Sequence, residues 1–147
     1  MPSCHMLSQR LADDVATALG LILRHLAGSG YRFATPTPST HQRVLAHRSP
    51  QMAATLRDVF GWNMAFKIAT CVGTTLELLA AMRVAGVLHT HGDVMRSLVR
   101  VGSIGDELFV HSAYPTSNDD AVFFGPDTYR FAQFVQHGLA TFKCDGS

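Results

Sequence analysis

The sequence predicts an α+β fold, in which a helical N-terminal part is followed by a winged-helix-like combination of a helix and a β-hairpin. Two observations predict it. Apolar residues recur at three- and four-residue steps in several segments before residue 86, and two short β-branched or aromatic runs then flank a Gly-Asp turn. The chain has 147 residues, 47% hydrophobic and 16% charged, which is typical of one domain with its own core.

The first helix is expected over residues 7–26, because one face of that segment is apolar. The face consists of Leu7, Leu11, Val15, Leu19, Ile22 and Leu26. Gly28 and Gly30 supply its stop signal. Residues 31–33 are then expected to be extended, before a proline-containing loop.

Two short helices are expected next. Ser39 can cap a helix that runs through Ala46. Ser49 followed by Pro50 indicates the start of another, because proline suits the first helical position, and this helix is expected to end near Gly61. Its apolar residues are Met52, Leu56, Val59 and Phe60.

A further helix is expected to begin at residues 73–75, Gly-Thr-Thr, and to end at Gly86. Its apolar side consists of Leu76, Leu79 and Met82. Beyond it, residues 98–101 and 108–110 flank the turn at Gly105-Asp106, which predicts a β-hairpin.

The last part of the chain is expected to hold one more helix. A polar loop over residues 115–120 leads into residues 122–124, Val-Phe-Phe. The helix is expected from about Thr128, with Asp127 as its cap. A core cluster under the hairpin is expected from Phe60, Trp62 and Phe66.

Three segments of the chain resemble one protein family. They are residues 57–62 (RDVFGW), residues 103–112 (SIGDELFVHS) and residues 121–131 (AVFFGPDTYRF), the last being the most specific. They resemble the N-terminal domain of bacterial class I S-adenosylmethionine-dependent methyltransferases of the small-domain group. The resemblance covers roughly residues 20–137, and it is weakest over residues 64–75 and 138–147.

The resemblance implies that residues 1–147 form a substrate-recognition domain, with residues 121–137 at the junction to a catalytic domain. It places Tyr129 and Arg130 at that junction. It implies that the lid of the cofactor pocket consists of Gly125, Pro126, Asp127 and Thr128. Without the resemblance, Gly-Pro-Asp is ordinary chemistry for a turn and a helix cap.

Two motifs of a complete methyltransferase are missing from the chain. The only glycines after Phe131 are Gly138 and Gly146, so this part of the sequence contains no glycine-rich cofactor turn. The sequence also contains no two adjacent prolines, which an Asn-Pro-Pro motif requires. We therefore expect this chain to contain no catalytic residue and to bind no S-adenosylmethionine. We also expect that its reading frame is truncated or frameshifted and that the chain is inactive alone.

The resemblance implies that the substrate is a translation component, such as ribosomal RNA or a ribosomal protein, and that the partner is a separate catalytic chain. A homodimer through an exposed C-terminal surface is the alternative partner. That surface would consist of Phe123, Phe124, Tyr129, Phe131 and Phe134.

A free-standing winged-helix module that binds nucleic acid or a protein is the second hypothesis. The 12 basic and 11 acidic residues give a net charge of +1, which excludes a protein that coats nucleic acid by bulk charge. A local basic face would draw on Arg43, Arg48, Arg57, Lys67, Arg83, Arg96 and Arg100. Scattered solubilising charge explains the same residues.

Three other candidate sites are weaker. His89 and His91 with Asp93 have the residue types of a zinc site but no convincing partner set, so no metal is expected. Ser112, His111 and Asp119 have the residue types of a hydrolase triad, but a GxSxG elbow is missing. Cys71 lies in a small apolar stretch and is expected to be buried and inert.

The chain is expected to be cytoplasmic. No stretch approaches the roughly 18 consecutive apolar residues that a membrane span needs, so no membrane partner is expected. The three cysteines, Cys4, Cys71 and Cys144, form no CxxC pair, and their odd number indicates reduced thiols.

Overall fold

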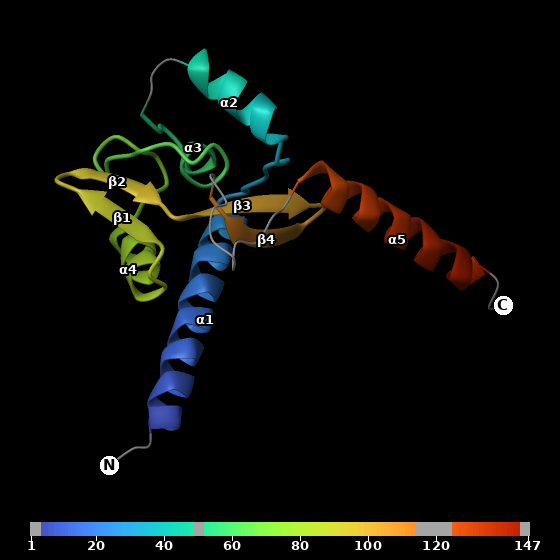
Figure 1. The fold of residues 1–147 in the computed structure, drawn as a ribbon, viewed down its shortest axis with the longest axis horizontal. Coiled ribbons are helices and arrows are strands. Elements are labelled where there is room, and N and C mark those ends of the chain that lie inside the picture. Colours follow the sequence, from blue (N-terminus) through green and yellow to red (C-terminus); the bar gives the residue numbers. More distant parts are fainter. Residues whose placement is uncertain (1–3, 49–51, 114–124, 145–147) are drawn as a thin grey trace.

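The computed structural model describes residues 4–48, 52–113 and 125–144. Within them the chain forms five helices and two antiparallel two-stranded sheets, which confirms the α+β class (Figure 1). The elements are α1 (Cys4–Gly28), α2 (Pro38–Ala46), α3 (Leu56–Phe60), α4 (Leu76–Val84), β1 (Leu88–His91), β2 (Val94–Ser97), β3 (Val99–Ile104), β4 (Glu107–Ser112) and α5 (Pro126–Cys144). The long helices α1 and α5 leave the body in diverging directions.

The first helix ends where the glycines predict. Gly30 adopts a positive φ of 72°, and the Tyr31 amide donates to the carbonyl oxygen of Leu26 at 3.0 Å, as in a Schellman C-cap. Beyond the cap, Tyr31 and Phe33 are buried and Arg32 is exposed, which confirms the extended segment.

Helix α2 begins earlier than Ser39 predicts. Thr37 is the cap, because its Oγ1 accepts a hydrogen bond from the Thr40 amide at 3.3 Å. Pro38 then occupies the first helical position, where its missing N–H costs no hydrogen bond.

Helix α3 is shorter than predicted, and its expected start lies outside the described residues. Residues 52–55 are not helical. Thr55 and Asp58 form a capping box that begins the helix at Leu56, and the carboxylate of Asp58 accepts from the Thr55 amide at 3.1 Å. The amide of Ala53 is used elsewhere, since it donates to the Ala65 carbonyl at 2.8 Å.

Helix α4 confirms the predicted segment and corrects its buried face. Thr75 caps it, and Gly86 follows it with a φ of 70°. The residues that α4 buries are Leu78, Leu79, Ala81 and Met82. Leu76, expected on the core side, is 75% exposed, because residues 78, 81 and 82 place the buried face on the other side of the helix.

The predicted hairpin is present, and a second one precedes it. Strands β3 and β4 pair from Val99↔Ser112 to Ile104↔Glu107, around a turn where Gly105 has a φ of 57°. The hairpin that directly follows α4 is β1–β2, with Gly92 in its turn, and the sequence reasoning missed it. The hairpin that was predicted to follow this helix directly, β3–β4, is therefore separated from α4 by β1–β2.

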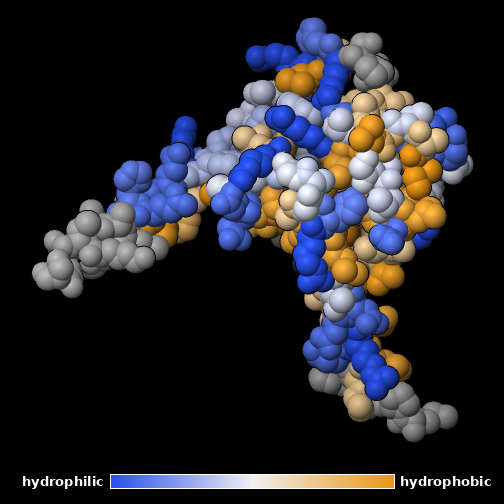
Figure 2. All heavy atoms as spheres, turned by 180° about the vertical axis from the view of Figure 1, so that it is seen from behind, coloured by the Kyte–Doolittle hydropathy of each residue, from blue (hydrophilic) through white to orange (hydrophobic). Residues whose placement is uncertain are grey.

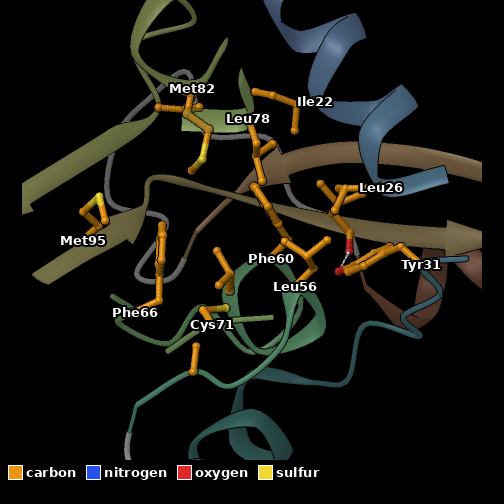
Figure 3. Packing of buried hydrophobic residues seen from close by; sticks show 14 of the residues in the cluster. Ile22, Leu26, Tyr31, Leu56, Phe60, Phe66, Cys71, Leu78, Met82 and Met95 are labelled. Carbon is orange, nitrogen blue, oxygen red and sulfur yellow. Dashed lines mark hydrogen bonds between the residues drawn. The ribbon is translucent and has the colours of Figure 1, made fainter. Parts of the chain in front are cut away.

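One apolar core joins these elements. Figure 3 shows side chains from α1, α3, α4 and β2 converging on it. Those labelled include Ile22, Leu26, Leu56, Phe60, Leu78, Met82 and Met95. The expected cluster holds for Phe60 and Phe66, which are fully buried, whereas Trp62 is only partly buried at the edge of the core.

Helix α5 begins two residues before the predicted start, at Pro126. Asp127 is therefore inside the first turn and is not the cap. Gly125 precedes the helix instead: its amide donates to Thr128 Oγ1 at 3.4 Å, and its carbonyl accepts from the Thr128 amide at 2.9 Å. Among the helices described, none is both long enough and apolar enough to cross a membrane.

Candidate functional site

The four residues expected to form a pocket lid lie together at the start of α5. The next residue, Tyr129, fastens this turn to the body. Its hydroxyl accepts from the Thr35 amide at 2.9 Å and lies 3.3 Å from the Phe33 carbonyl, to which it donates. Phe33 is in turn bonded to β3, because the Ser103 amide donates to the same carbonyl at 2.9 Å. The first turn of α5 is therefore fixed in position.

Beyond that turn, α5 has an exposed apolar face. Phe131 is 68% exposed and Phe134 is 74% exposed, and Val135 is on the same side of the helix. Tyr129 was expected in the same exposed cluster, and that expectation is wrong because its ring lies half-buried against the body. Two other members of the predicted cluster, at positions 123 and 124, lie outside the described residues.

The sequence reasoning missed a buried basic cluster. Arg100 was expected on a surface, yet it is fully buried in β3. Its Nε donates to the Gly61 carbonyl at 2.9 Å, and its Nη2 lies 3.2 Å from Nδ1 of buried His41. His111 is the cross-strand neighbour of Arg100 on β4 and is also buried. A register rule applied to the predicted hairpin could have found this pair.

Both histidines are held neutral. Burial, together with the nearby Arg100 charge, lowers the pKa of His41 from 6.5 to about 4. The same two causes lower the pKa of His111 to about 4. At neutral pH the cluster therefore carries the positive charge of Arg100, with two uncharged rings beside it.

Aromatic rings complete this environment. Phe33 and Trp62 pack edge to face, with centroids 5.2 Å apart. The guanidinium groups of Arg57 and Arg100 lie 5.6 and 6.0 Å from the Phe33 ring, and that of Arg48 lies 5.9 Å from the Trp62 ring. These arginines pack against aromatic side chains and are not grouped to face a phosphate backbone.

The remaining basic residues do not form one face. Arg48 pairs with Asp58, and Lys67 pairs with Asp93 at 2.9 Å. Three other arginines that were named for a basic face are exposed, and they lie on different elements: Arg43 on α2, Arg83 on α4 and Arg96 on β2. Figure 2 shows polar and apolar residues interspersed over the side of the body that it draws. Scattered charge therefore describes these residues better than a basic face does.

The other candidate sites gain no support. His89 and His91 are both exposed on β1, and within the residues that the structure describes no group of three or more His, Cys, Asp or Glu could hold a metal ion. Asp93 is engaged by Lys67, whose hydrogen bond and charge lower the pKa of that carboxyl. In the proposed triad, Ser112 is adjacent to His111 on one strand, and Asp119 lies outside the described residues.

Cys71 is buried, and burial raises the pKa of its thiol to about 11. This confirms that Cys71 is buried, and the raised pKa supports the expectation that it is inert, because the thiolate is the nucleophile and is scarce near neutral pH.

A cavity of about 470 Å³ lies beside the C-terminal end of α1 and the start of α3. Two arginines are part of its wall. Arg32 is bonded to Asp106 and to the Gly105 carbonyl, and Arg57 lies over the Phe33 ring. Both cations therefore already have partners within the fold.

No protein-family model, no curated protein and no solved structure matches this chain. The resemblance to methyltransferases therefore rests on the three sequence segments described above alone.

Proposed function

We propose that this chain is the non-catalytic substrate-recognition domain of an S-adenosylmethionine-dependent methyltransferase that acts on a translation component. The similarity of residues 57–62, 103–112 and 121–131 to that family indicates the activity. One structural observation supports it. The first turn of α5 is bonded to the body through Tyr129, while the aromatic face beyond it is exposed. A helix that carries a second domain needs a fixed base and an apolar face for that domain.

Three of the four lid residues offer no free backbone N–H to S-adenosylmethionine. A cofactor at a helix start is held by free backbone N–H groups. Here the amides of Gly125 and Thr128 are bonded within the turn, and Pro126 has no N–H. The cofactor would therefore belong to the catalytic chain, and the turn would contribute its shape to the wall of the pocket.

Among translation components, the surface favours a protein over RNA. Helix α4 is the helix that precedes the β1–β2 hairpin. Its exposed residues are Leu76, Glu77, Ala80, Arg83 and Val84. One arginine beside one glutamate does not suit a phosphate backbone, and the net charge of the chain is only +1. We therefore propose that the recognised substrate is a ribosomal protein.

The first test is to sequence the genomic DNA that follows the codon for Ser147. We expect a glycine-rich cofactor turn followed by Asn-Pro-Pro in one of the three frames. Absence of both motifs would favour the free-standing winged-helix module over the methyltransferase proposal.

The second test measures docking on α5. The downstream segment, made as a separate chain, is expected to bind this chain in isothermal titration calorimetry. The double variant Phe131→Ser/Phe134→Ser should weaken binding by about tenfold or more, because buried aromatic residues dominate interface energies. Gln133→Ser, an exposed polar position on the same helix, is the matched control and should bind normally. Equal affinity of all three proteins would contradict the proposed docking face.

The third test addresses the substrate. In a gel-shift experiment with ribosomal RNA we expect no complex at physiological salt. A complex whose affinity falls steeply with salt would instead support the free-standing winged-helix module, because counterion release produces that dependence.

A further inference from the structure

A shallow groove lies between α1 and α4, with a volume of about 400 Å³. Its lining consists of Asp14, Thr17, Ala18, Leu21, Glu77, Ala80, Ala81 and Val84. Small alanines form much of it, and Leu21 and Val84 are about half exposed. Its acidic side chains are Asp14 and Glu77. The groove therefore combines an apolar surface with negative charge, as a docking site for an amphipathic helix does.

The same side of α1 continues beyond the groove toward the N-terminus. Leu7, Arg10 and Asp14 follow at three- and four-residue steps, so they share one side of the helix with Leu21. Figure 1 shows that this half of α1 extends away from the body, past α4. Leu7 is 49% exposed and Leu11 is 67% exposed. An apolar stripe that is buried farther along the helix is therefore uncovered over its first half.

We propose that this surface binds the α1 helix of a second copy of the chain, in the antiparallel orientation. The two-fold axis lies between the two helices, beside Ala12 of each copy. In this register position 10 of one copy faces position 14 of the other, and position 7 faces position 17. Arg10 of each copy then meets Asp14 of the other, and Leu7 of each copy enters the groove of the other. One register satisfies both the charges and the apolar contacts.

Symmetry and charge favour this occupant. A two-fold interface uses the same surface on both copies, so each contact occurs twice. The N-terminal half of α1 contributes Arg10 and the groove contributes Asp14, so unlike charges face each other across the axis. The exposed face of α5 takes no part, so the dimer is independent of the methyltransferase proposal.

The test is a charge-exchange experiment on the whole chain by sedimentation equilibrium. At about 100 µM, where a micromolar complex is populated, we expect a dimer. Arg10→Asp and Asp14→Arg should each weaken self-association by roughly tenfold or more, because like charges then meet across the axis. An equimolar mixture of the two variants should restore the dimer, because both aspartates of the first variant then face arginines of the second. Restoration by mixing cannot come from contacts within one helix.

Two further variants separate this interface from others. Leu7→Asp, at a half-exposed position that enters the partner groove in this register, should dissociate the dimer, and Leu98→Asp, a half-exposed leucine between β2 and β3, should not. A monomer at the highest concentration overturns the proposal. So does a dimer that survives Leu7→Asp, or one that the mixture of charge variants fails to restore.

Discussion

Acidification should destabilise this fold through His41 and His111. Both rings are buried beside the Arg100 guanidinium, and burial with that charge lowers the pKa of each to about 4 in the folded chain. In the unfolded chain both return to about 6.5. Above pH 6.5 both states hold the rings neutral and the full stability is present. As the pH falls below 6.5, the two histidines bind protons in the unfolded state but not in the folded state. The free energy of unfolding therefore decreases until the pH reaches about 4.

The size of the effect follows from the two pKa values. A depression from 6.5 to about 4 corresponds to roughly 3 kcal/mol per histidine once the loss is complete. Between about pH 7 and pH 5 each histidine should contribute a loss of about 2 kcal/mol in the free energy of unfolding. Two such losses are a large part of the total stability of an ordinary domain.

Urea denaturation at the two pH values measures this loss. His41→Asn and His111→Asn remove the titrating group and keep a polar atom near the position of Nδ1. Each should flatten the pH dependence by about 2 kcal/mol relative to the parent chain. His89→Asn, at an exposed position on β1, is the matched control and should leave the pH dependence unchanged.

The quantity compared is the change in the free energy of unfolding between the two pH values. A variant that is less stable than the parent at both pH values is therefore still informative. If His41→Asn and His111→Asn show the same loss on acidification as the parent and as His89→Asn, the buried histidines are not the cause. The reasoning from burial and the Arg100 charge would then be refuted.

Three predictions concern packing and reactivity. Gly61→Ala should lower the free energy of unfolding by about 1–3 kcal/mol in urea denaturation, because the added Cβ would lie 2.6 Å from Cε2 of the Phe33 ring. Gly20→Ala, whose Cβ would meet no atom closer than 4.0 Å, is the control and should stabilise the helix by roughly 0.5–1 kcal/mol. Asp58→Ala should cost about 1–2 kcal/mol in the same assay through loss of the capping box; unchanged stability would contradict that role. Cys71 should resist alkylation at pH 8 until urea is added, followed by peptide mass spectrometry; rapid labelling of the folded chain would contradict its burial.

Local signals predicted the helices well where one residue decides the backbone. Gly30 and Gly86 adopt positive φ angles, and α1 and α4 end just before them. The start of α3 was predicted wrongly because two signals compete. Proline at position 50 indicates an early start, whereas the capping box of Thr55 and Asp58 sets the observed one. The amide of Ala53, bonded to Ala65, is a long-range contact that no local rule describes.

The strands show a different limit. Hairpin β1–β2 was missed because β1 is polar and mostly exposed, so it lacks the alternation that marks a half-buried strand. The buried basic cluster was missed for a related reason. Arg100 and His111 become neighbours only through the pairing of β3 with β4, and His41 reaches them from α2. Residue type alone places an arginine on the surface, and only the tertiary structure moves this one inside.

Phe33 connects α5 to Trp62 through its backbone carbonyl and its ring. Its carbonyl receives the Tyr129 hydroxyl that holds α5, and its ring packs against Trp62. Trp62 is the only tryptophan in the sequence. Under the docking on α5 that we propose, a displacement of the Tyr129 hydroxyl would be passed by Phe33 to the one indole in the protein. We expect Trp62 fluorescence to change when a partner binds α5, so the chain contains its own optical reporter of that event.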